Sequence, residues 1–147
     1  MPAAPALPMP ADRILPHRPP MRLVDTLLSC ENGSGEAEAC IQAHSFLAGG
    51  DGGIDEAALI ELIAQAYAAV KGYDDLAHGK PPGKGFLVGM RKIRITGKAR
   101  AGDRLRISIR TVGVFANFAV VEGAVARGGE TLASGTLKLW LAEDAGE

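Results

Sequence analysis

Hydrophobic and polar residues alternate along several segments of the chain, as they do in strands that bury one face. The clearest case is the segment 103–114, where Leu105, Ile107 and Ile109 alternate with arginine and serine side chains. Residues 36–43 show the same period of two, with alanine and isoleucine at every second position. This period places one face of each strand in a core and the other in water, which is typical of an antiparallel sheet.

Further strands are expected on both sides of these two. Residues 21–29 look like a first strand, and Asn32-Gly33 supplies the positive φ angles of a hairpin turn before the next one. After residue 84, the segment 85–95 is apolar and strand-like. The last part of the chain predicts a hairpin over 118–141, turning at two adjacent glycines.

Residues 54–72 form the one helix that the pattern predicts. Asp55 and Glu56 place negative charge where a helix begins, and Lys71-Gly72 resembles a helix end. Between them nearly every side chain is apolar all round the helix, so we expect other structure to enclose it. Two strands, one helix and then about four strands indicate an α+β fold. In this fold a curved antiparallel sheet of about five to six strands wraps around one long central helix.

The length of 147 residues fits a single domain. Four prolines among the first ten residues predict a flexible N-terminal arm over 1–12, followed by the domain at 13–142 and a short tail at 143–147. The longest apolar stretch, 57–70, is too short to cross a bilayer and contains Glu61. With no basic segment typical of a signal peptide at its start, the chain is expected to be cytoplasmic and without a membrane partner.

The charge of the chain bears on its partners. Sixteen Lys+Arg against 17 Asp+Glu give a net charge of −1, which argues against a nucleic-acid partner. Positive charge nevertheless gathers in residues 71–110, a distribution that suits either an acidic or phosphate-bearing partner or ordinary solvated strand faces. No cluster has the spacing of metal ligands and no phosphate-binding loop motif is present, so we expect neither a metal nor a cofactor.

Glu61 and Gln65 are the polar exceptions in the apolar helix, and their spacing of four places them on one face. A carboxyl buried in such surroundings can be held protonated and act as a general acid. Alternatively, it can be a carboxylate at a subunit interface, paired with an arginine or with backbone amides. His17, in a proline-rich turn, is interpreted as structural, and His78 as exposed.

His44 ends the second predicted strand and precedes a glycine-rich segment, 45–53, that leads directly into the helix. A strand end, closely approaching backbone and a helix start together suit an acyl-binding mouth in which free N–H groups polarise a carbonyl.

Four segments of the chain carry recognisable motifs. The chain has Leu-Pro-His-Arg-Pro-Pro-Met-Arg-Leu-Val-Asp at 15–25 and Ile-Glu-Leu-Ile-Ala-Gln at 60–65. It also has Gly-Phe-Leu-Val-Gly-Met-Arg-Lys-Ile-Arg-Ile at 85–95 and Ala-Gly-Asp-Arg-Leu at 101–105. These motifs resemble those of the 3-hydroxyacyl-[acyl-carrier-protein] dehydratases of the hot-dog fold. The sequence around the histidine, Ala-His-Ser-Phe at 43–46, differs from the usual Gly-His-Phe-Pro and is similar to a divergent, aryl-polyene-type branch.

The resemblance implies a catalytic site. His44 takes the position of the base and Glu61 that of the acid, contributed by opposite protomers of a homodimer, and Gln65 orients Glu61. The family pattern also implies that Gly52, Gly53 and Phe46 bind the substrate.

The activity that the resemblance implies is removal of water from a 3-hydroxyacyl thioester. The product is a trans-2-enoyl thioester, in fatty-acid or polyketide-like biosynthesis. Acyl carrier protein or coenzyme A carries the substrate, and assembly beyond a dimer stays open. Two alternatives remain at this point. One is a hot-dog thioesterase or enoyl-CoA hydratase, and the other is a non-catalytic acyl-binding protein.

Overall fold

The computed structural model describes residues 5–18, 21–42, 53–81 and 83–142. Their helices are a short 3-10 turn, η1 (Ala11–Arg13), and one long α-helix, α1 (Glu56–Ala77). The strands are β1 (Met9–Pro10), β2 (Thr26–Glu31), β3 (Ser34–Cys40), β4 (Lys84–Ile95), β5 (Arg104–Phe115), β6 (Phe118–Arg127) and β7 (Glu130–Ala142).

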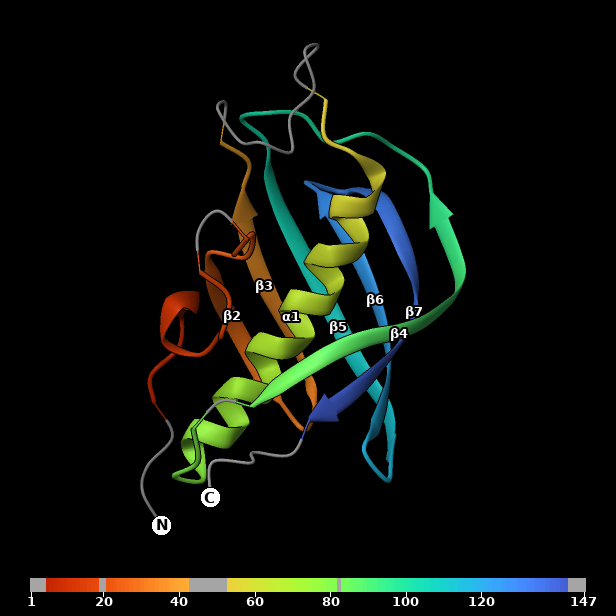
Figure 1. The fold of residues 1–147 in the computed structure, drawn as a ribbon. Coiled ribbons are helices and arrows are strands. Elements are labelled where there is room, and N and C mark those ends of the chain that lie inside the picture. The colour runs from red at the N-terminus through yellow and green to blue at the C-terminus, as the bar shows by residue number, and fades with distance from the viewer. Residues whose placement is uncertain (1–4, 19–20, 43–52, 82, 143–147) are drawn as a thin grey trace.

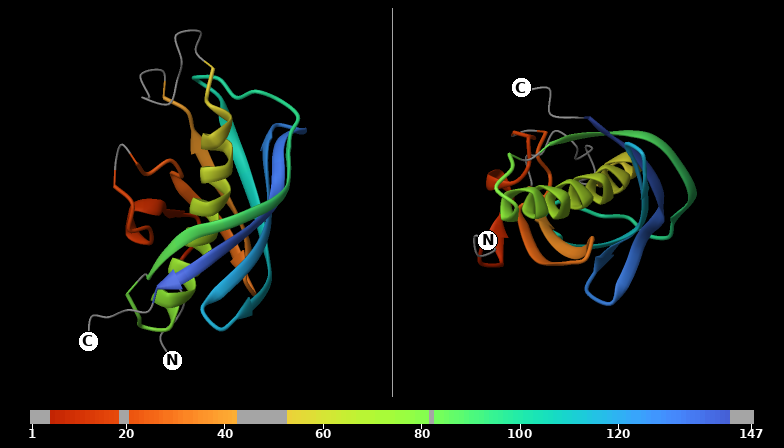
Figure 2. Two further views of the ribbon diagram at one scale, coloured as in Figure 1. Left: turned by 45° about the vertical axis from the view of Figure 1, so that its right-hand side comes forward. Right: turned by 90° about the horizontal axis from the view of Figure 1, so that it is seen from below.

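All seven strands belong to one antiparallel sheet, in the order β1-β2-β3-β5-β6-β7-β4. The sheet curves around α1, which lies along its concave side (Figures 1 and 2). This is the predicted α+β architecture. The sheet has more strands than the predicted five to six, because the two-residue β1 extends the edge beside β2.

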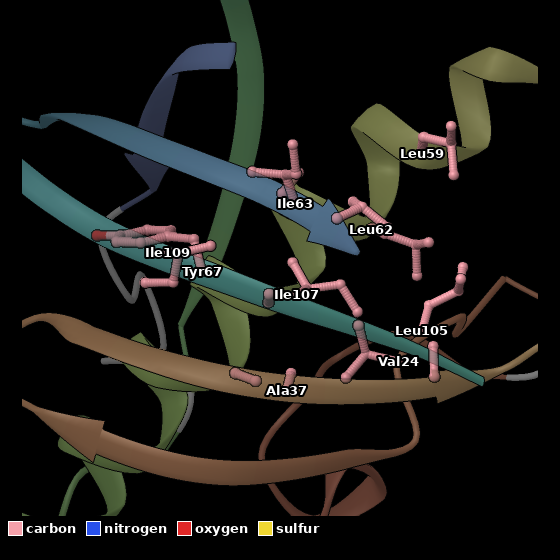
Figure 3. Packing of buried hydrophobic residues seen from close by; sticks show 14 of the residues in the cluster. Val24, Ala37, Leu59, Leu62, Ile63, Tyr67, Leu105, Ile107 and Ile109 are labelled. Atoms are coloured by element: carbon pink, nitrogen blue, oxygen red, sulfur yellow. The ribbon is translucent and has the colours of Figure 1, made fainter. Parts of the chain in front are cut away.

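The core forms between α1 and the inner face of the sheet (Figure 3). Leu62 and Ile63 of the helix are fully buried, as is Ile107 of β5. On β6, Gly123 allows the helix to come close, because a Cβ there would stand 2.4 Å from Ile63 Cγ2. The alternation read in 103–114 therefore marks the inner face of β5 correctly, with Leu105 also buried there.

The helix runs past its predicted end at residue 72 and continues to Ala77. Gly72 does not cap the helix but makes room for a packing contact, since a Cβ there would lie 2.2 Å from the main-chain oxygen of Ile14. The side chain of Asp55 caps the other end by accepting a hydrogen bond from the Ala57 N–H at 2.8 Å.

Residues 9–13 pack onto the domain, although most of them fall within the predicted N-terminal arm, 1–12. Met9 is 1% exposed and Ala11 is fully buried. Pairing of β1 with β2 and the hydrogen bond from Ala11 N to Asp25 O at 2.8 Å hold the segment in place. The apolar side chains between the prolines explain the attachment, because burying them stabilises the folded chain.

The two edges of the sheet differ in length. One is formed by the short β1 and the other by β4, which spans twelve residues. On β4, Phe86, Val88 and Met90 are each more than half exposed. A long edge strand with exposed apolar side chains is a surface that proteins usually cover by pairing with another chain or element.

Candidate active site

Glu61 lies on the second turn of α1 and faces a cavity between the helix and the sheet. The apolar helix pattern predicts a buried carboxyl group, but in the single chain the side chain of Glu61 is 43% exposed. The difference arises because the cavity, of about 230 Å³, opens beside it. The carboxyl group is thus placed where a bound molecule could reach it.

The cavity is lined mainly by apolar groups. The helix contributes Ala64, Tyr67 and Ala68 next to Glu61, and the far wall comes from β4 and β7, with lining residues Gly85, Phe86, Leu87, Leu139, Leu141 and Ala142. Its one lysine, Lys71, is paired with Asp75 at 2.5 Å, so its charge is offset. Burial, with Asp75 and Asp74 nearby, raises the pKa of Tyr67 to about 12, so its phenol stays neutral at physiological pH. Such a cavity suits an apolar acyl chain.

Gln65 is the residue that fixes Glu61. Its side chain is 1% exposed, and its Nε2 donates to Glu61 Oε2 at 2.9 Å and to the Met21 main-chain oxygen at 2.8 Å. Its Oε1 accepts hydrogen bonds from the N–H groups of Leu23 at 2.7 Å and Val24 at 3.2 Å. All these bonds together determine which way the amide points, and they tie the segment before β2 to the helix.

His17 approaches Glu61 from the N-terminal segment. Its Nε2 lies 3.9 Å from Glu61 Oε2, and both residues line the cavity. The interpretation of His17 as purely structural therefore misses its location. No periodic pattern could have revealed it, since the contact depends on how the turn before β2 crosses the helix. The only signal was its place in the Leu-Pro-His-Arg-Pro-Pro motif.

Of the other predicted site residues, His44, Phe46 and Gly52 lie outside the described residues. Gly53 is buried and pairs with Arg100 as an isolated bridge beside the start of α1. The structure thus places Glu61 and Gln65 in contact on one face of α1.

The turn opposite Gly53 is held by Asp103. Its Oδ2 accepts hydrogen bonds from Arg100 N and Arg127 Nη1, both at 2.8 Å, and Gly102 in the turn has a φ of 93°. Burial opposes ionisation of Asp103, but these hydrogen bonds and the nearby arginine charges outweigh it and lower the pKa of the carboxyl. The ionised carboxylate braces the loop that contacts the helix start.

Part of the predicted basic region, residues 71–110, is paired with acidic side chains. On the outer face of β5, Arg106 pairs with Glu36 at 3.2 Å and Arg110 pairs with Glu122. These cross-strand pairs favour the interpretation of solvated strand faces for this strand. On β4, Arg91 and Arg94 are exposed.

No helix within the described residues is both long and apolar enough to cross a membrane. Among the same residues, no three His, Cys, Asp or Glu side chains gather as metal ligands would.

Comparison with known proteins shows to which family the chain belongs. The family model of ApeP-like proteins, described as ApeP dehydratase, matches residues 9–147. The chain belongs to the ApeP-like dehydratase family. This confirms the resemblance seen in the sequence motifs, including the divergent branch, and makes the chain a dehydratase of polyketide-like biosynthesis. No curated protein sequence gives a match.

Solved structures show that this ApeP-like chain has the hot-dog fold. The dehydratase heterocomplex ApeI:P from Xenorhabdus doucetiae is 23% identical, with a TM-score of 0.86 over 92% of this chain and 93% of that one. Protein smu.793 from Streptococcus mutans UA159, bound to acetyl CoA, is 17% identical, with a TM-score of 0.65 over 87% and 95%. A hypothetical thioesterase with coenzyme A from Streptococcus pneumoniae TIGR4 is 14% identical, with a TM-score of 0.62 over 79% and 86%.

Proposed function

We propose that this dehydratase removes water from a 3-hydroxyacyl thioester carried by acyl carrier protein and forms a trans-2-enoyl thioester. The proposal rests on the carboxyl group of Glu61, which faces an apolar cavity and has one oxygen held by Gln65. Elimination of water needs an acid beside the departing hydroxyl and room for an acyl chain next to it. The cavity supplies both in one place.

In the proposed reaction His44 takes the proton from C2, and Glu61 gives a proton to the hydroxyl leaving C3. The electrons of the C2–H bond form the new double bond, and water departs with the Glu61 proton. The thioester contacts Phe46 and the backbone of Gly52 and Gly53, where no Cβ stands between main chain and substrate. No cofactor takes part in this scheme.

Two backbone N–H groups at and just before the start of α1 already have hydrogen-bond partners. The N–H of Ile54 donates to the Ala99 main-chain oxygen at 2.9 Å, and that of Ala57 donates to the side chain of Asp55. For this reason these two amides are not assigned to the thioester in the proposed scheme.

The proposed active unit is a homodimer that pairs along β4. Two features support it. β4 is a long sheet edge with exposed Phe86 and Val88, and residues of the same strand line the cavity of Glu61. A second chain on this edge would cover the cavity and could bring its own His44 near Glu61. Assembly beyond the dimer and a cytoplasmic location stay predictions.

The catalytic part of the proposal is tested with Glu61→Gln, which keeps the size of the side chain and removes the acid. Dehydration of a 3-hydroxybutyryl thioester, on carrier protein and on coenzyme A, should fall at least a hundredfold. Glu56→Gln is the matched control, because Glu56 is exposed on the same helix and should leave the rate unchanged. Normal turnover by Glu61→Gln would remove Glu61 from the mechanism, and release of free acid would assign a thioesterase instead.

The dimer is tested by sedimentation of Val88→Lys, which places a charge on the β4 edge. The control is Val112→Lys on β5, an interior strand of the sheet, where the valine is similarly exposed at 49% against 53% for Val88. We expect the parent chain and the control to sediment as dimers and Val88→Lys as a monomer with little activity. A monomeric parent chain would contradict the homodimer. Activity regained only with a different hot-dog subunit would show a heterocomplex.

A further inference from the structure

The imidazole of His17 is held beside Glu61 by a braced turn. The residues before it, Ile14 and Leu15, are buried at 0% and 3% exposure and anchor the segment in the core. Arg18 closes the turn, since its Nη1 donates to the main-chain oxygens of Leu15 at 3.0 Å and His17 at 3.1 Å. The position of the ring is therefore set by the fold and not by a mobile loop end.

The two ring nitrogens of His17 have different surroundings. Nδ1 is buried and has no hydrogen-bond partner among the described residues, whereas Nε2 lies on the cavity side, 3.9 Å from Glu61 Oε2. A buried N–H group without an acceptor is strongly disfavoured. A neutral His17 therefore carries its proton on Nε2, the nitrogen that faces the carboxyl group.

Both neighbours of the carboxyl group approach the same oxygen. Gln65 Nε2 donates to Glu61 Oε2 at 2.9 Å, and His17 Nε2, the protonated nitrogen of the neutral ring, lies 3.9 Å from the same oxygen. If the His17 N–H also reaches Oε2, that oxygen accepts from two donors and is poorly placed to carry the acidic proton, because its own hydrogen would meet theirs. Among the described residues, no donor reaches the other oxygen, Oε1.

We propose that His17 is a positioning residue that, with Gln65, holds Oε2 of Glu61 as an acceptor and so leaves Oε1 to carry and deliver the proton. The separation of 3.9 Å shortens to a hydrogen bond when substrate fills the cavity, as catalytic hydrogen bonds often do. The inference deepens the proposed dehydratase function and rests on it for its catalytic consequence. The hydrogen placement itself can be measured without turnover.

The first test is nitrogen-15 NMR of the histidine rings in the full chain, at about pH 8, where an ordinary imidazole is neutral. His17 is expected in the Nε2–H form. His78 is an internal control of opposite kind, because its Nδ1 lies 2.8 Å from the Asp74 main-chain oxygen and predicts the Nδ1–H form. The histidine signals that are absent from the spectrum of His17→Leu are assigned to His17. An Nδ1–H form for His17 would overturn the inference, even if the chain showed no activity.

The second test compares two substitutions in the dehydration assay. His17→Leu removes the donor, and kcat should fall about tenfold, about 1.4 kcal/mol in barrier, with KM little changed. His17→Gln should keep kcat within about threefold, because the glutamine Nε2 can stand where the imidazole Nε2 stood. Thermal melts check that both variants fold.

Each outcome of the second test is decisive. Equal kcat for His17→Leu and the parent chain would refute the positioning role. Equal loss in both variants would refute it too, and would indicate that His17 transfers a proton itself. An inactive parent chain would count against the proposed function, and the ring spectrum would then decide the inference alone.

Discussion

Replacing Gln65 with leucine removes the side chain that links the helix to Glu61 and to the segment 21–24. The substitution deprives the N–H groups of Leu23 and Val24 and the main-chain oxygen of Met21 of their partner. A buried polar group left without a partner costs about 1–3 kcal/mol. Only the Val24 bond is fully buried, so we take about 2 kcal/mol for it and about 1 kcal/mol for each of the others. Burying leucine in place of glutamine returns about 1–2 kcal/mol. The net loss is then about 2–3 kcal/mol of unfolding free energy.

Urea unfolding followed by circular dichroism measures this loss. Because a dimer unfolds in a concentration-dependent way, all variants are compared at one protein concentration. The matched control is Gln42→Leu, since Gln42 is the other glutamine of the chain and is exposed. The midpoint should fall by about 1–2 M urea for Gln65→Leu and by little for the control. A loss below about 1 kcal/mol in Gln65→Leu would show that these hydrogen bonds do not stabilise the fold as expected.

Two further predictions concern the helix. Gly72→Ala should lower the melting temperature, with a loss of about 1–3 kcal/mol, because its Cβ would stand 2.2 Å from the Ile14 oxygen. Gly129→Ala, with no atom within 4 Å of its Cβ, should change little, and an unchanged melting temperature in Gly72→Ala would contradict the packing. The pKa of Tyr67 is about 10 in the unfolded chain and about 12 in the folded chain. The parent chain should therefore lose stability as the pH rises between these two values, because only the unfolded chain releases the proton there. Urea unfolding at about pH 9 and about pH 11 should show a smaller loss for Tyr67→Phe, and equal losses would contradict the raised pKa.

Local patterns in the sequence predict most of the fold. The alternation on β5 and the Asn32-Gly33 turn, whose residues have φ angles of 52° and 79°, both describe the structure correctly. Patterns fail where distant contacts decide. The helix passes Gly72 because the glycine packs against Ile14, and Met9 joins the sheet because β2 lies beside it.

For the candidate site, local sequence patterns predict one contact and miss another. Glu61 and Gln65 stand out because two polar side chains, four residues apart, interrupt an apolar helix. The hydrogen bond between their side chains is therefore predictable from helix geometry. The approach of His17 depends instead on the path of the chain between η1 and β2. A tertiary contact of this kind leaves no periodic trace in one sequence.

Hydration of a crotonyl thioester, the reverse reaction, tests the proposed dehydration when the parent chain is compared with His44→Ala. We expect 3-hydroxybutyryl product from the parent chain and at least a hundredfold less from the variant. Parent-chain activity that survives in His44→Ala would remove His44 from the mechanism. Absence of hydration with both carrier-protein and coenzyme A thioesters would contradict the proposed reaction.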